Sequence, residues 1–131
     1  MRILLHIGTD KAGSTAIQQH LYLNREWLAD RQVYLPSEGF GENNGHAALF
    51  ESENPAALER LQEELLAARA ARHHLAILSW EGLSLFSRSR IRQLLSYLAP
   101  ADYSVLVYLR EQADIVQSGY LQQVKSLTHP L

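Results

Sequence analysis

Four short apolar runs alternate with segments of helical spacing, and this alternation constrains the fold more than any other feature of the sequence. Such continuous apolar runs are typical of strands that are buried on both faces. Strands alternating with helices predict an α/β domain in three layers, with a mostly parallel central sheet and right-handed crossovers. The predicted strands are residues 2–7, 32–36, 75–80 and 103–110. The predicted helices are residues 14–30, 54–72, 87–98 and 112–125.

The size and composition of the chain favour one globular domain, residues 1–131, of which 47% are apolar and 20% charged. A net charge of −2 argues against a general nucleic-acid binder. The chain has no cysteine, which excludes disulfides, thiolate metal sites and a cysteine nucleophile. No apolar stretch approaches the ~20 residues of a membrane span. We therefore expect a cytoplasmic bacterial protein that binds neither nucleic acid nor membrane.

A loop framed by two glycines joins the first predicted strand to the first predicted helix. Gly8 and Gly13 have the spacing of a P-loop, and Thr15 fits its final hydroxyl, but Ser14 stands where a P-loop has lysine. Lys11 lies inside the loop instead. Backbone N–H groups in such a loop, together with the dipole of the following helix, bind anions. The loop is therefore expected to bind phosphate, the alternative being an ordinary strand-to-helix turn with a surface lysine.

A second candidate phosphate contact lies at the end of the last predicted strand. Arg110 ends this strand, and Ser118 follows eight residues later, about two turns into the next predicted helix. Arginine offers a planar fork of donors that suits phosphate. Because the carboxyl ends of parallel strands meet at one edge of a sheet, Arg110 is expected on the same edge as the glycine loop. The alternative is that Arg110 pairs with Glu111 or Asp114.

The two motifs together resemble those of sulfotransferases that use 3′-phosphoadenosine 5′-phosphosulfate (PAPS). The run Lys11-Ala12-Gly13-Ser14-Thr15 resembles their 5′-phosphosulfate loop. Arg110 and Ser118 match their 3′-phosphate site, and Tyr120 fits the aromatic residue that often follows. The N-terminal stretch is especially similar to bacterial sulfotransferases that act on carbohydrates. The resemblance implies a P-loop NTPase-like sulfotransferase fold.

The resemblance also implies a reaction and a role for each motif residue. Lys11 would contact the bridging oxygen between phosphate and sulfuryl group, where negative charge develops as the bond breaks. Arg110 and Ser118 would bind the 3′-phosphate. The reaction would move a sulfuryl group from PAPS to a hydroxyl or amine, with a carbohydrate as the expected acceptor and no metal required. The residues expected to bind PAPS are Lys11, Ala12, Gly13, Ser14, Thr15, Arg110 and Ser118.

The acceptor must lose a proton, and a positioned Glu or His is the usual base. Glu81 follows the third predicted strand, at the expected edge. His46 lies in a long Gly- and Asn-rich loop, and Glu38 follows the second predicted strand, where some carbohydrate sulfotransferases place a catalytic glutamate. All three remain candidates. The alternative for each is a solvated loop side chain, and Glu81 could instead orient Lys11 or the acceptor.

Two other functions remain open. The first is a P-loop kinase-like nucleotide-binding protein, against which Ser14 and the lack of a clear magnesium-binding aspartate both count. The second is a non-catalytic sulfotransferase remnant, because the family is usually longer and closes its site with a basic C-terminal segment that we expect to be absent here. Such an incomplete fold could expose an apolar sheet edge that pairs with a second copy.

Three arginines mark the start of the helix predicted over residues 87–98. Arg88, Arg90 and Arg92 are expected to form a solvated face or to meet an anionic acceptor. Two histidines, His73 and His74, lie at the end of the preceding predicted helix, where histidine caps carbonyl groups.

Overall fold

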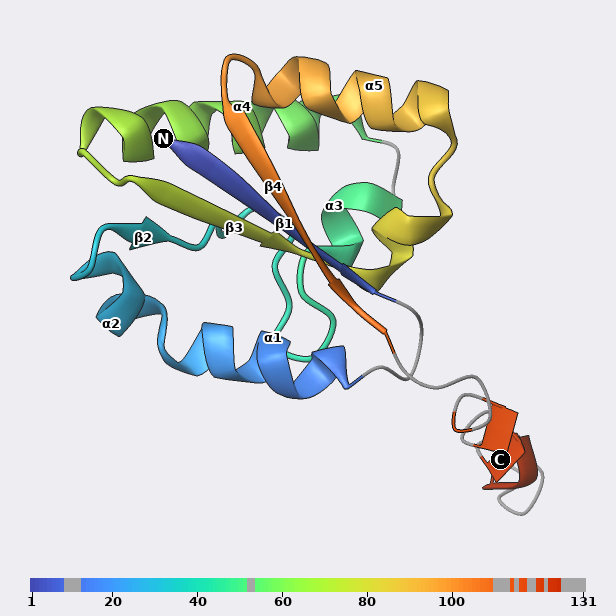
Figure 1. Cartoon of the computed structure of the whole chain (residues 1–131). Coiled ribbons are helices and arrows are strands. Elements are labelled where there is room, and N and C mark those ends of the chain that lie inside the picture. The colour runs from blue at the N-terminus through green and yellow to red at the C-terminus, as the bar shows by residue number, and fades with distance from the viewer. Residues whose placement is uncertain are drawn as a thin grey trace.

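A parallel sheet forms the centre of the computed structural model, which describes residues 1–8, 13–51, 54–109, 114, 116–117, 120–121 and 123–125 (Figure 1). Over these residues the sheet has four strands in the order β2-β3-β1-β4, and every neighbouring pair is parallel. The predicted α/β fold with a parallel sheet is therefore confirmed. The strands are β1 (Arg2–Gly8), β2 (Val33–Tyr34), β3 (Leu75–Ser79) and β4 (Asp102–Tyr108).

Helices cover both faces of this sheet. Helices α1 (Ser14–Leu23) and α2 (Arg25–Ala29) lie on one side, and α4 (Pro55–Ala70) and α5 (Arg88–Leu98) lie on the other (Figure 1). The connection from β1 to β2 runs along the sheet in the direction opposite to those from β2 to β3 and from β3 to β4. Because crossovers in parallel sheets share one hand, opposite directions place their helices on opposite faces.

The main apolar core lies between the sheet and the α4–α5 layer. The buried positions of α4 recur at intervals of three and four residues, as one face of a helix requires. Asn54 caps this helix by accepting a hydrogen bond from the Ala56 N–H at 3.1 Å, and Pro55 follows at the first helical position. The core includes Ile3, Leu61, Leu65, Leu78, Leu94 and Leu98.

The structure departs from the predicted elements in two helical segments. The helix predicted over residues 14–30 is divided at Asn24, whose Nδ2 donates to the His20 carbonyl at 2.8 Å and so ends α1. The apolar spacing of the helix predicted over residues 87–98 predicts an inner face that includes Ile91, Leu94 and Leu98. In α5, Leu94 and Leu98 are buried, but Ile91 is 38% exposed. Two short helices were not predicted, α3 (Ala47–Glu51) and the 3₁₀ helix η1 (Glu81–Leu85).

Strand β4 forms one edge of the sheet and pairs with β1. Its apolar side chains are exposed on both faces, in contrast to the buried side chains of β3. Val105 and Val107 alternate with Leu106 and Tyr108 along the strand, and all four are exposed.

None of the helices in the described ranges is long and apolar enough to cross a membrane.

We expect Leu61→Ala to lower the free energy of unfolding by about 2–5 kcal/mol, because it removes a fully buried side chain from the face of α4 that packs on the sheet. The matched control is Leu66→Ala on the same helix, where the side chain is 55% exposed and the expected loss is below about 1 kcal/mol. Urea denaturation of both variants measures the difference. Equal losses would contradict the assignment of the core.

Candidate functional site

The candidate site lies at the carboxyl ends of β1 and β3. These neighbouring strands continue in opposite directions, since β1 leads to β2 at one edge of the sheet and β3 leads to β4 at the other. Ligands of parallel α/β sheets bind at such a switch point. The loop after β1 enters α1, and β3 continues into η1, so Ser14 and Glu81 meet although they are 67 residues apart in the sequence.

The N-terminus of α1 is suited to bind an anion. Gly13 precedes the helix with a φ of 88°, in the left-handed region that glycine adopts readily. It has no side chain to cap the helix, and the first turn, residues 14–17, carries no acidic side chain. The first N–H groups and the positive end of the dipole therefore face the loop. Thr15 is exposed at this end of the helix.

Two polar side chains of α1 hold the carboxylate of Glu81. Ser14 Oγ donates a hydrogen bond to Oε1 of Glu81, and Gln18 Nε2 donates to Oε2 at 3.0 Å. The spacing of four residues places Ser14 and Gln18 on the same face of the helix, and both are buried. The apolar spacing in residues 14–30 predicts a buried stripe that includes Ala16 and Leu23, but both side chains are exposed. Near the loop, α1 therefore turns a polar face toward the sheet.

Glu81 is held in its ionised form. Partial burial raises the pKa of this carboxyl, but other interactions outweigh burial and leave the pKa below its usual value. These are the hydrogen bonds from Ser14, from the backbone and from Gln18, together with the electrostatic influence of His6. The site therefore contains an oriented carboxylate next to the helix N-terminus.

A second layer of polar groups lies beneath this carboxylate. His6 on β1 and Ser79 on β3 are register partners, and His6 Nδ1 lies 2.7 Å from Ser79 Oγ. Burial lowers the pKa of His6, against the opposing effect of the Glu81 charge, so the ring is neutral near pH 7. Within the described part of the chain, His6 Nε2 and Gln18 Oε1 are buried without a hydrogen-bond partner. Gln18 Oε1 can therefore accept a further hydrogen bond, and His6 Nε2 can accept or donate one, according to its tautomer.

His46 is buried behind Ser79 and acts as a structural clamp. Its Nδ1 accepts a hydrogen bond from the Ser79 N–H at 3.0 Å, so its Nε2–H donates to the Pro36 carbonyl at 3.2 Å. Burial lowers the pKa of His46 to about 4. Gly45 permits this close approach, since a Cβ there would lie 2.1 Å from the Ser79 carbonyl oxygen. Both ring nitrogens are engaged away from solvent, which argues against the expected role of His46 as a base.

Glu38 is held by α4. Nε and Nη2 of Arg60 donate to its two carboxylate oxygens at 2.9 and 2.8 Å, and this pairing lowers the pKa of Glu38. The preceding residue, Ser37, is bound through its N–H to Glu64 of the same helix at 2.9 Å. The structure therefore brings Glu81 together with Ser14, while Glu38 is committed to fixing the loop after β2.

Several candidate residues cannot be placed. Lys11, Ala12, Arg110 and Ser118 lie outside the described residues, so their expected roles stay predictions. Sequence reasoning missed Gln18 as a partner of Glu81 and His6 as a partner of Ser79. The four-residue spacing of Ser14 and Gln18 was a signal for the role of Gln18.

In the ranges that the structure describes, no group of three or more His, Cys, Asp or Glu side chains is arranged to hold a metal ion.

The fold and the site define this chain as an α/β protein with a parallel sheet and a half-buried carboxylate, held by two side chains of α1, at its switch point. No protein-family model matches the sequence, and neither a curated protein nor a solved structure matches it. Its function must therefore be inferred from the residues themselves.

His46→Gln tests the structural role of His46, because glutamine keeps a donor and an acceptor but does not titrate. In the unfolded wild type, His46 has a pKa near the ordinary 6.5, whereas in the folded protein its pKa is about 4. Between these two pH values the unfolded state therefore binds a proton that the folded state does not. Stability is therefore lost as the pH falls from 6.5 to 4. We expect a smaller loss over this window in His46→Gln, measured by urea denaturation at each pH.

The control is His74→Gln, which removes an exposed histidine in the turn after α4. It is expected to follow the wild type. If His46→Gln lost stability over this pH window as steeply as the wild type, the assignment of His46 as a buried, neutral structural residue would be wrong.

Proposed function

We propose that this protein is a PAPS-dependent sulfotransferase that transfers a sulfuryl group to a hydroxyl or amine, with a carbohydrate as the expected acceptor. Two sequence motifs support the proposal, the Lys11–Thr15 loop and the Arg110–Ser118 pair. The observation that carries it is the hydrogen bond between Ser14 and Glu81. This bond joins the expected phosphate-binding loop to an ionised carboxylate at the switch point, where a base is required.

The described residues fit the 5′-phosphate end of PAPS. The N–H groups at the start of α1 and the hydroxyl of Thr15 would hold this phosphate, since Gly13 leaves the helix end open. PAPS, when bound, supplies the sulfuryl group. Lys11, within the same loop, would stabilise the charge that develops on the bridging oxygen.

Glu81 is our candidate for the base. An ionised carboxylate can take the proton of the acceptor hydroxyl as the new S–O bond forms. The Ser14 hydroxyl can donate one hydrogen bond, and in this structure it donates that bond to Glu81. A phosphate that drew this hydroxyl away would leave Glu81 with fewer hydrogen bonds and a higher pKa. Nucleotide binding would thereby make Glu81 a stronger base.

The nucleotide preference separates this proposal from a kinase-like function. Titration calorimetry without magnesium should show tighter binding of 3′-phosphoadenosine 5′-phosphate than of ATP, because only the former carries the 3′-phosphate assigned to Arg110. Arg110→Ala should abolish this preference, while Arg92→Ala on the exposed side of α5 should keep it. Tight ATP binding that requires magnesium would reject the sulfotransferase site.

Transfer of labelled sulfate from PAPS to a panel of glycans and phenols tests the base. We expect Glu81→Gln to lower kcat by roughly 10²–10⁴-fold, since it removes the proton acceptor while keeping the shape of the side chain. Glu38→Gln, the matched control, should stay within a few-fold of wild type because Arg60 already occupies that carboxylate.

Lys11→Ala should lose transfer with a smaller loss of nucleotide binding. If the wild type binds the bisphosphate but transfers sulfate to no acceptor in the panel, the non-catalytic function is correct. Equal kcat losses in the Glu81 and Glu38 variants would refute the choice of Glu81.

A further inference from the structure

Strand β4 forms an edge of the sheet that lacks the usual protection against pairing. It pairs with β1 along its whole length, and in the described part of the chain no strand pairs with its other side. Natural edge strands are kept from pairing by shortness, a bulge, proline or charged side chains. The register of β4 on β1 advances without a bulge, and its one charged residue is Asp102, at its start. The opposite edge, β2, is protected because it has only two residues.

The side chains of β4 are apolar on both faces of the sheet, as those of central strands in parallel sheets are. Tyr103 faces α5, because its hydroxyl donates to the Leu95 carbonyl at 3.3 Å. Val105 and Val107 follow on the same face by alternation and are 58% and 46% exposed. Leu106, on the other face, is 42% exposed. The strand therefore has the composition of one with two neighbours, whereas the described residues supply only one.

The backbone of this edge limits what could cover it. Every second residue of an edge strand directs its N–H and C=O groups outward, and an extended chain pairs them in a ladder. A helix could cover the apolar side chains of β4 but would leave these backbone groups without protein partners. The strand of this chain that matches β4 in length is β4 of a second copy, since β2 would pair over only two residues.

Antiparallel pairing centred on Val105 joins β4 of two copies along the whole strand. Val105 then lies opposite Val105 of the second copy, on a two-fold axis, and Tyr103 lies opposite Val107. Pairs of β-branched and aromatic residues of this kind stabilise sheets. Asp102 lies at the end of the ladder, opposite Tyr108, so no like charges face each other. The same surface is used by both copies, and such a contact closes into a dimer.

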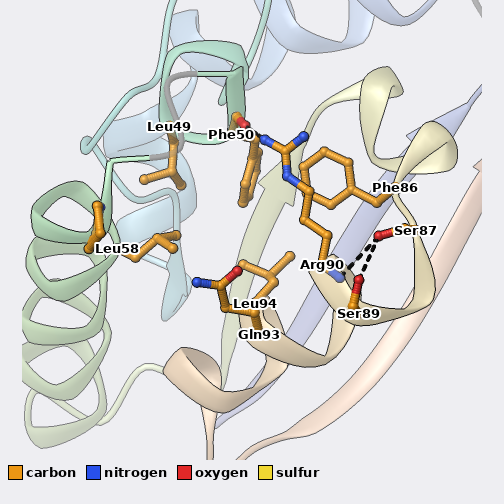
Figure 2. A pocket seen from close by; sticks show the side chains of 10 residues that line it. Leu49, Phe50, Leu58, Phe86, Ser87, Ser89, Arg90, Gln93 and Leu94 are labelled. Atoms are coloured by element: carbon orange, nitrogen blue, oxygen red, sulfur yellow. Dashed lines mark hydrogen bonds between the residues drawn. The ribbon is translucent and has the colours of Figure 1, made fainter.

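A second surface with apolar side chains is a poorer partner for β4. It is the cavity of about 380 Å³ between the N-terminal ends of α4 and α5 (Figure 2). Its polar groups are bonded within the molecule. Arg90 Nη2 donates to the Phe50 carbonyl, and the hydroxyls of Ser87 and Ser89 are 2.9 Å apart. Entry of β4 into this cavity of another copy would join two different surfaces, which gives rings or open chains of molecules rather than a dimer.

We propose that two copies of this chain pair through β4, antiparallel about a two-fold axis at Val105, so that their sheets become one continuous sheet. The carboxyl ends of the strands of the two copies then point in opposite directions. The two Ser14–Glu81 sites therefore lie at opposite edges of the joined sheet. The proposal does not depend on the sulfotransferase function.

Sedimentation equilibrium over a range of concentrations tests the proposal, and we expect the wild type to have twice the mass of the chain. Val105→Lys places two like charges opposite each other on the axis and should raise the dissociation constant at least about ten-fold. The matched control is Leu66→Lys on α4, which should stay dimeric. Both side chains are more than half exposed, so both variants should fold, and thermal melting by circular dichroism verifies this.

An equimolar mixture of Val105→Lys and Val105→Glu tests for direct contact at the axis. Each variant alone should dissociate, whereas in the mixture opposite charges meet on the axis and mixed dimers should form. No recovery of dimer in the mixture would overturn the placement of Val105 on the axis.

Single cysteines determine the register, because the chain has no cysteine of its own. Opposite residues of antiparallel strands have Cα atoms roughly 4.5–5.5 Å apart, within the range of a disulfide. We therefore expect Val105→Cys to form a disulfide-linked dimer on mild oxidation. Val107→Cys, which would face Tyr103 of the second copy, and Leu66→Cys on α4 should not form one.

Three outcomes would overturn the proposal. A monomeric wild type would leave the edge of β4 to an extended segment of a different protein. Open-ended polymers would indicate contact between two different surfaces. Cross-linking of Val105→Cys no stronger than that of Val107→Cys would show that the two strands do not pair in this register.

Discussion

The parallel register between β1 and β3 decides which residues meet at the functional edge of the sheet. Pairing His6 with Ser79 brings the carboxyl ends of both strands to the same level, so that the start of α1 faces the start of η1. A shift of one residue would turn Ser79 to the opposite face of the sheet. The buried ring of His46 reinforces this arrangement, since it binds the Ser79 backbone from the loop before α3.

The edge so formed is polar where most of the interior is apolar. Burying polar side chains is unfavourable unless they are hydrogen-bonded, and Ser14, Gln18 and Ser79 all have partners here. The carboxylate of Glu81 is the centre of this network, because it accepts from two side chains of α1. Its environment therefore depends on the position of α1, and any ligand that moves the start of this helix changes the carboxylate as well.

The order and type of the main elements could be predicted from the sequence because each has its own apolar period. The α4 stripe through Leu61 and Leu65 is one example, and the apolar run of β3 is another. The division of the first helix at Asn24 could not be predicted, because it depends on one side-chain hydrogen bond to the His20 carbonyl. Glu81 could be placed at the edge from its position after a strand. The hydrogen bonds that hold His46 and Glu38 could not be predicted, because their partners are distant in the sequence. These partners are Ser79 for His46 and Arg60 for Glu38.

Trp80 gives the molecule a natural optical probe. It is one of two tryptophans, and the other, Trp27, lies on α2 and is 53% exposed beneath the guanidinium of Arg31. Trp80 precedes Glu81 in the chain, and its indole stacks on the ring of Phe50 in α3. With Trp27 replaced by phenylalanine, the fluorescence of one indole would respond to changes at the neighbouring carboxylate, without any attached dye.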